Sequence, residues 1–140
     1  MLFNERLHWA AFVALIAAFG WYFLAYPWAL IGTRAGVGAA AGMLVPVVII
    51  IIGAMTITAA YFAIRNPKEV DIKEDERERT IHMRGTHIAY YPLVLGVWAN
   101  LFAIFYHLSA AAHLNILIAT VVIAELVRVG SQLYFYRRGY

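Results

Sequence analysis

The sequence predicts an all-α integral membrane protein: four transmembrane helices in an antiparallel bundle, with a charged cytoplasmic helix that continues into the third span. Hydrophobic residues make up 64% of the 140 residues and charged residues only 14%, whereas soluble domains average about 45–50% and about 25%. Twelve of the nineteen charged side chains fall between residues 65 and 87. The remaining sequence therefore contains apolar runs long enough to cross a bilayer, within a single domain of residues 1–140.

The first two spans are expected at residues 7–31 and 37–64. The first stretch carries no charge, and about 20 apolar residues suffice to cross the ~30 Å of hydrocarbon in a bilayer. A short turn that contains Arg34 separates the two spans. Gly38 and Gly42 lie four residues apart near the start of the second span, a spacing that lets helix backbones approach closely in lipid.

A charged segment, residues 65–86, leads into the second half of the chain. It is expected to contain a helix that starts at Asp71, with Glu74 as the capping-box partner. The third span is expected at residues 87–108 and the fourth at 114–136, ending in aromatic residues and two arginines that are typical of a membrane interface. The connection between these spans is too short for anything except an antiparallel return.

Lysine and arginine are distributed unequally about the four spans. Four spans place both termini and the charged segment on one side, and this side carries nine of the eleven basic residues. Only Arg34 lies on the opposite side, and Arg128 lies within a span. Because cytoplasmic loops are enriched in Lys and Arg, we expect both termini in the cytoplasm.

Several classes of function fit this composition poorly. The net charge is only +3, and the basic residues of the charged segment are matched by acidic ones, so direct nucleic-acid binding is not expected. The chain has no cysteine, which excludes disulfides and thiolate metal sites. No phosphate-binding loop, catalytic triad or zinc-protease motif occurs, so no cofactor and no enzymatic activity is expected.

Glu125 and Arg128 are the only charged residues deep inside a span. Glu125 lies about 16 Å into the fourth span at ~1.5 Å per residue, close to the bilayer centre. Gln132 falls on the same helix face, and Asn100, Thr56 or Thr58 on neighbouring helices are the candidate partners. With Asn100 as the partner, Glu125, Arg128 and Gln132 form a candidate proton or ion site in which Glu125 titrates and Arg128 tunes it. The alternative is a structural ion pair that fixes helix rotation or a subunit contact, and the sequence leaves both readings open.

The chain contains five histidines, which are candidate ligands. A bis-histidine haem site needs two histidines facing each other at one depth, and His8 and His87 are the best candidates for such a pair. Histidine at a membrane interface is common without being a ligand. No metal site is therefore predicted.

Residues 75–91, DERERTIHMRGTHIAYY, carry a resemblance to a known group of proteins. They resemble the hallmark of an uncharacterised family of small multi-span prokaryotic membrane proteins, a cytoplasmic Asp-Glu-Arg-Asp/Glu-x-x-Ile-x-x-Lys/Arg-Gly segment followed by a span with a tyrosine. The matching positions are Asp75, Glu76, Arg77, Glu78, Ile81, Arg84, Gly85 and Tyr90. The resemblance implies a prokaryotic cytoplasmic (inner) membrane and, since some members look like companions of helix-turn-helix regulators, a regulatory role.

The leading hypothesis is a non-enzymatic membrane protein whose charged segment mediates self-association or docks a cytoplasmic regulatory partner. Gly85 and Pro92 are expected to act as hinges between this segment and the third span. The expected partners are the lipid bilayer, further copies of the chain and a cytoplasmic protein. The residues expected to bind such a partner are Asp75, Glu76, Arg77, Glu78 and Arg84.

The alternative is a small oligomeric transporter or channel, coupled to protons or ions, that uses Glu125. Four short spans leave little room for a pathway inside one chain, so an oligomer is required. A lipid-modifying enzyme built on His8, His82 and His87 is the third possibility, and its signal is too generic to favour.

Overall fold

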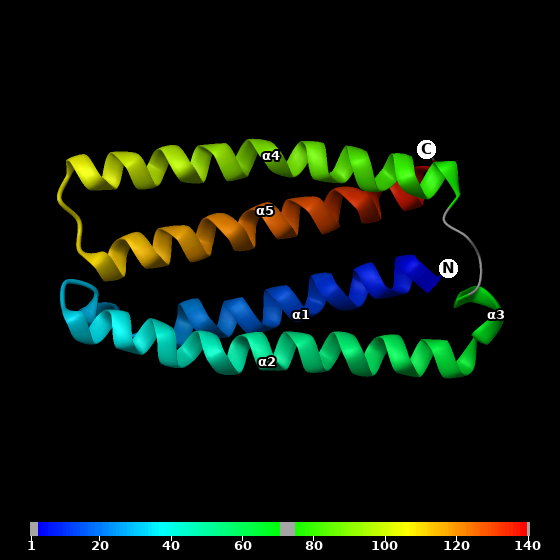
Figure 1. Cartoon of the computed structure of the whole chain (residues 1–140), viewed down its shortest axis with the longest axis horizontal. Helices are drawn as coiled ribbons and strands as arrows, with labels where there is room; N and C mark the ends of the chain where they lie inside the picture. Colours follow the sequence, from blue (N-terminus) through cyan, green and yellow to red (C-terminus); the bar gives the residue numbers. More distant parts are fainter. Residues whose placement is uncertain (1–2, 71–74, 140) are drawn as a thin grey trace.

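The computed structural model describes residues 3–70 and 75–139, except the side chains of residues 69 and 70, and all regular secondary structure in this part of the chain is helical. Four helices are long and apolar enough to cross a membrane (Figure 1): α1 (Phe3–Ala25), α2 (Arg34–Arg65), α4 (Glu76–Phe105) and α5 (Ala110–Arg138). The short helices η1 (Trp28–Leu30) and α3 (Pro67–Val70) lie in the connections. The prediction of an all-α chain with four span-length helices is confirmed.

The first helix is shorter than the predicted span. It ends at Ala25 rather than near residue 31, because Pro27 has no backbone N–H and disfavours helix at the residue before it. The chain then turns through η1, where the Leu30 N–H donates to the carbonyl of Pro27 at 2.9 Å. The second helix ends at Arg65, just before Asn66 and Pro67, as the sequence predicts.

The charged segment does continue into the third long helix. Asp75 is the N-cap of α4, and its Oδ1 accepts a hydrogen bond from the Glu76 N–H at 2.8 Å. Asp71 and Glu74, the predicted cap and its partner, lie outside the described residues. From Glu76 the helix is unbroken to Phe105 and passes through both Gly85 and Pro92. Its 30 residues give a length of about 45 Å at ~1.5 Å per residue, more than the ~30 Å that hydrocarbon requires.

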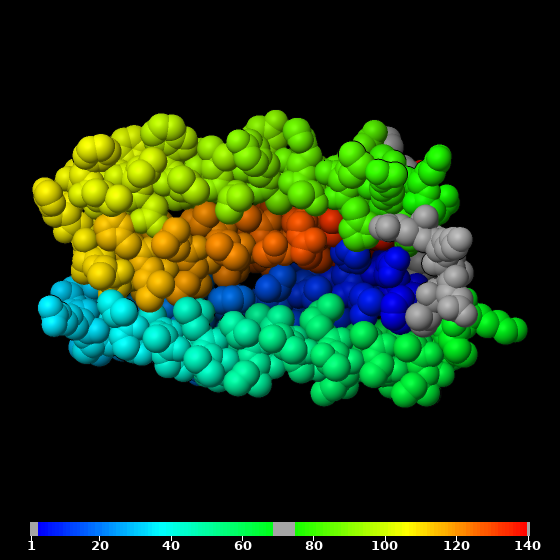
Figure 2. All heavy atoms as spheres, viewed as in Figure 1, coloured from blue at the N-terminus to red at the C-terminus, as the bar shows by residue number. Residues whose placement is uncertain are grey.

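The long helices lie side by side, with α5 between α4 and α1 (Figure 1). Along its length α4 packs mainly on α5, whereas α5 also contacts α1 and α2. Both chain ends and α3 lie at one end of the molecule, here called the terminal end. The turn at η1 and the α4–α5 connection lie at the other, the loop end. Side chains fill the space between α4 and α5, whereas the surface is hollowed between α5 and α2, with α1 visible behind (Figure 2).

Small residues bring α4 and α5 together. A Cβ added at Gly85 would lie 2.5 Å from Cγ of Gln132, and one added at Gly96 would collide with the Thr120 side chain. Gly38 and Gly42, where the sequence predicts close helix contact, have nothing within 4 Å of an added Cβ. Within one chain, the close approach of two helices is therefore made by Gly85 and Gly96 of α4, which face α5, and not by the glycines of α2.

At the loop end, buried tyrosines of α1 and the turn after it join three helices. The Tyr22 hydroxyl donates to Asn115 Oδ1 of α5 at 3.0 Å, and the Tyr26 hydroxyl donates to the Gly36 carbonyl of α2 at 2.8 Å. Both rings are almost completely buried, in a core that includes Val47. These contacts fix the rotation of α5 about its axis, and therefore the direction in which its polar side chains point.

Candidate functional site

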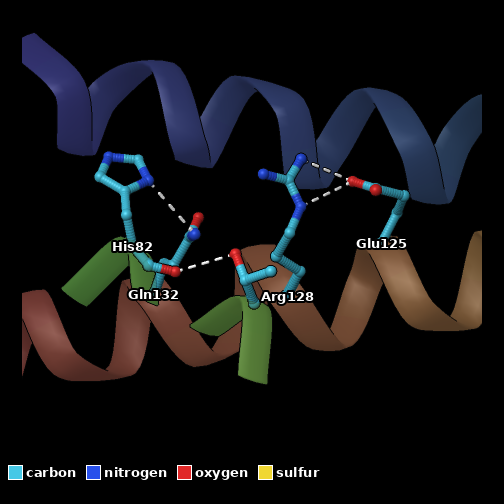
Figure 3. Close-up of polar contacts among 5 residues, drawn as sticks. His82, Glu125, Arg128 and Gln132 are labelled. Carbon is cyan, nitrogen blue, oxygen red and sulfur yellow. Dashed lines mark hydrogen bonds and ion pairs between the residues drawn. The ribbon is translucent and has the colours of Figure 1, made fainter. Parts of the chain in front are cut away.

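The polar side chains of α5 lie on a face that points into the molecule. Glu125, Arg128 and Gln132 follow the i, i+3, i+7 spacing, which places them on one side of a helix. Figure 3 shows all three projecting from α5 toward α1, with His82 reaching from α4 into the same space. The prediction that these three side chains share a face is correct.

Glu125 and Arg128 form an ion pair within α5. Both Nη2 and Nε of Arg128 donate to the same carboxylate oxygen, Oε2 of Glu125, at 2.6 and 3.0 Å (Figure 3). The side chains are not sealed in the interior, since 40% of Glu125 and 38% of Arg128 is exposed in the single chain. A charged pair of this kind is stable beside water or polar groups and unstable beside hydrocarbon.

Gln132 lies one turn beyond Arg128 toward the terminal end and is completely buried. Its Nε2 is 3.3 Å from Nδ1 of His82 (Figure 3). Its Oε1 accepts no hydrogen bond from the described part of the chain. Gly85 makes this position possible, because any larger residue there would occupy the space of the Gln132 side chain.

Two histidines complete the path to the terminal end. The rings of His8, on α1, and His82, on α4, lie with centroids 5.2 Å apart. Nδ1 of His8 lies 2.6 Å from the Asn4 carbonyl oxygen. Because a carbonyl only accepts, this nitrogen carries the proton, and in neutral His8 Nε2 is the acceptor. The Asn4 amide in turn donates to Glu78 Oε1 at 2.9 Å, which ties α1 to the charged start of α4.

We call Asn4, His8, Glu78, His82 and Gln132 the terminal polar cluster. It joins α1, α4 and α5 at the terminal end. The sequence groups His8 with His82 and His87 as candidate residues of one site, but it does not indicate that His8 pairs with His82. The pairing itself depends on how α1 and α4 approach each other.

Asn100 does not belong with Glu125. Its Nδ2 donates to the backbone carbonyl of His113 at 3.3 Å, and its Oδ1 is 2.5 Å from Nδ1 of the same residue. His113 lies twelve residues before Glu125 on α5, about 18 Å away at ~1.5 Å per residue. The prediction that Asn100 completes the Glu125 site is therefore wrong, and Asn100 forms a separate contact near the loop end.

His8 does not pair with His87, because its ring packs against His82 and Tyr136 instead. His87 packs edge-on against Tyr91 of its own helix. Among the described residues, no group of three or more histidine or acidic side chains is placed to hold a metal ion.

Several of the residues expected to bind a partner also make contacts inside the chain. Asp75 caps α4, Glu78 accepts from Asn4, and Arg77 Nη2 donates to the Tyr136 carbonyl at 3.4 Å. Glu76 and Arg84 are exposed. Docking through this surface stays a prediction, as do hinges at Gly85 and Pro92.

Comparisons with protein-family models, with curated proteins and with solved structures found no match. The fold itself defines the class: an all-α chain whose four long helices have the length and composition of membrane-spanning helices.

Proposed function

We propose that this chain is a multi-pass protein of a prokaryotic cytoplasmic membrane, with its helices in an antiparallel bundle and both termini in the cytoplasm. Nine of the eleven lysines and arginines fall on the side of the termini and the charged segment. This asymmetry favours a cytoplasmic terminal end. The loop end, with Arg34 as its one basic residue, then faces the opposite side of the membrane.

Within that membrane, the geometry best supports the transport alternative: a small, non-enzymatic, oligomeric protein that moves protons or proton-coupled ions by way of Glu125. The observation that carries the proposal is the half-exposed Glu125–Arg128 pair in the middle of an apolar helix. A charge at the bilayer centre costs at least about 2.5–3.5 kcal/mol even on lenient insertion scales. The open side of the pair must therefore meet water or a second copy of the chain.

The terminal polar cluster supplies a route between this pair and the cytoplasm. Arg128, Gln132, His82 and His8 follow one another from the middle of α5 to the terminal end. Imidazole is the side chain best suited to exchange protons near neutral pH. Gln132 donates or accepts through its amide and orients the neighbouring ring. In this scheme the histidines pass protons, Glu125 binds them, and Arg128 holds the ionised carboxylate.

The loop-end half of the bundle is organised differently. Buried Ile118 and Val122 form an apolar layer on α5 between Glu125 and the next polar residue on that face, Asn115. Asn115 is bonded to Tyr22, and Asn100 to His113. The polar route lies on the cytoplasmic side of Glu125 and the apolar layer on its other side. This arrangement favours a transporter that opens to one side of the membrane at a time, rather than a channel with a continuous pore.

The test is proton flux into liposomes that contain the purified protein and a pH-sensitive dye. Glu125→Gln removes the titrating group while keeping its shape, and we expect it to abolish flux. Glu76→Gln, which removes an exposed carboxylate from the start of α4, is the matched control and should leave flux unchanged.

Oligomer size, measured by intact-complex mass, must accompany the flux measurement. Flux lost with the oligomer intact supports Glu125 as the titrating group. Dissociation of the oligomer by Glu125→Gln would show instead that the pair is a structural subunit contact, and wild-type flux in that variant would end the transport proposal.

Docking of a cytoplasmic partner is the second candidate, favoured by the exposed charges of Glu76 and Arg84 and by the resemblance of this segment. Reversing both, Glu76→Lys with Arg84→Glu, changes the surface without touching the cap at Asp75. A partner recovered with the native chain should be lost from this variant and kept by an Arg34→Glu control at the loop end. Equal recovery with both variants would contradict docking.

A further inference from the structure

A groove runs along the face of the molecule formed by α1, α4 and α5. Its middle part has a volume of about 540 Å³ and is lined by Phe12 of α1, Ile88 of α4 and α5 residues that include Leu126, Gly130 and Phe135. The lining is almost entirely apolar. A Cβ at Gly130 would be in ordinary contact with the Phe12 ring at 3.5 Å, so a side chain longer than that of alanine would extend into the groove. We call this feature, with its continuations at either end, the α5 groove.

The groove continues in both directions along α5. Toward the loop end a hollow of about 430 Å³ shares Ile123 and Leu126 with the middle part and extends between α5 and α1 to Phe23. Toward the terminal end a hollow of about 450 Å³ shares Ile88 and Phe135 with it. Between Ala119 and Phe135 the groove follows α5 for about 24 Å, at ~1.5 Å per residue. That exceeds the ~15 Å thickness of one hydrocarbon leaflet, so a lipid acyl chain fits along it.

The terminal mouth of the groove is basic. Arg84 and His87 of α4 line it. The Arg138 guanidinium lies over Tyr134, a groove residue, at 5.0 Å from the ring centroid. Within the part of the chain that the structure describes, no acidic side chain lines the middle or the terminal part of the groove.

A third arginine, Arg137, lies at the end of α5 and contacts α1. The Arg137 guanidinium lies 5.1 Å from the Trp9 ring centroid, and Trp9 packs edge-on against Phe12 at 6.2 Å. A cation–π contact holds the Arg138 head at Tyr134, a ring that also lines the apolar groove. Basic side chains of α4 and of the end of α5 therefore lie at the terminal end of a groove suited to hydrocarbon.

We propose that the α5 groove is a binding site for an anionic phospholipid, with an acyl chain along the apolar lining and the headgroup phosphate between Arg84, His87 and Arg138. Basic pockets between transmembrane helices select acidic headgroups by charge. A second copy of this chain suits the mouth less well, because an identical surface would bring the same cations against it. The proposal rests on the placement of the helices in a membrane and does not depend on proton transport.

The test is native mass spectrometry of the purified chain titrated with phosphatidylglycerol or with phosphatidylcholine of the same acyl composition. We expect the wild-type chain to bind phosphatidylglycerol in preference. Arg84→Gln and Arg138→Gln should each weaken phosphatidylglycerol binding about fivefold, and together about 25-fold, at the magnitude of one basic residue near an acidic membrane surface. Arg34→Gln at the loop end removes one positive charge far from the groove and should have no effect.

Gly130→Leu tests the contribution of the acyl chain separately from that of the headgroup, because the leucine side chain would fill the groove beside Phe12. It should weaken the binding of both lipids, with helix content unchanged by circular dichroism. Equal binding of the two lipids by the wild-type chain, or unchanged phosphatidylglycerol binding in the double arginine variant, would overturn the proposal. If the wild-type chain forms a dimer without bound lipid and Gly130→Leu dissociates that dimer, the lipid proposal is also overturned. The groove would then be the contact with a second copy of the chain. Glu125→Gln should keep the preference for phosphatidylglycerol, so failure of transport and failure of this site are distinguishable.

Discussion

Gly85→Ala is the most direct test of how the terminal polar cluster is held in place. The new Cβ would lie 2.5 Å from Gln132 Cγ and 3.1 Å from both Gln132 Cδ and the Arg128 carbonyl oxygen, where ordinary contact begins at 3.4 Å. The Gln132 side chain has little space into which to move, because it is completely buried and its amide meets His82. The Arg128 carbonyl belongs to the α5 backbone. Relief therefore requires α4 and α5 to separate by several tenths of an ångström along a tightly packed contact.

Overpacking of this kind costs about 1–3 kcal/mol. Replacing glycine by alanine inside a helix returns up to about 1 kcal/mol through helix propensity. Gly38→Ala is the matched control, because the substitution is the same and nothing lies within 4 Å of the added Cβ. We therefore expect Gly85→Ala to be less stable than Gly38→Ala by about 1–3 kcal/mol, the overpacking cost alone.

The assay is reversible unfolding of the detergent-solubilised chain by SDS, followed by circular dichroism. Gly85→Ala should unfold at a lower SDS fraction than Gly38→Ala, and it should also slow proton flux by displacing Gln132 from His82. If the two variants unfold at the same point, Gly85 does not set the distance between α4 and α5, and the packing argument fails.

The remaining predictions concern the loop end and the α4–α5 contact and use the same unfolding assay. Ser109→Ala should lower the unfolding free energy by at least about 1 kcal/mol, because Ser109 Oγ accepts from the Ala112 N–H at 3.2 Å and donates to the Ile31 carbonyl. Ser109→Asp should recover only the capping part of this loss, since a carboxylate accepts from an N–H but cannot donate to a carbonyl. Tyr22→Phe should lower the unfolding free energy by about 1 kcal/mol, because it removes the buried hydroxyl that donates to Asn115. The double variant Tyr22→Phe with Asn115→Leu should lose less than the sum of the two single changes, because it also removes the acceptor that Tyr22→Phe leaves without its donor. Gly96→Val should destabilise the chain more than Gly53→Val does, since nothing lies within 4 Å of a Cβ at Gly53, and equal effects would contradict the α4–α5 contact.

Local sequence determines the number of long helices, where some of them end and which polar residues share a helix face. Apolar stretches interrupted by one charged segment determine four long helices, and Pro67 determines where the second of them ends. The i, i+3, i+7 spacing determines that Glu125, Arg128 and Gln132 share a face, since helical geometry is the same in every context. The early end of the first helix is also encoded locally, because Pro27 lies inside the predicted span and disfavours helix at the residue before it.

Contacts between helices were decided only by the tertiary structure. The helices are apolar on nearly every side, so hydrophobic patterning barely indicates which face of each meets a neighbour. Glycine spacing pointed to Gly38 and Gly42, whereas shape complementarity selects Gly85 against Gln132. The separation of two polar residues along the sequence does not predict whether their side chains are in contact. Whether His8 meets His82 or His87 depends on how α1 approaches α4, a rotation and shift that many weak packing contacts set together and no local pattern records.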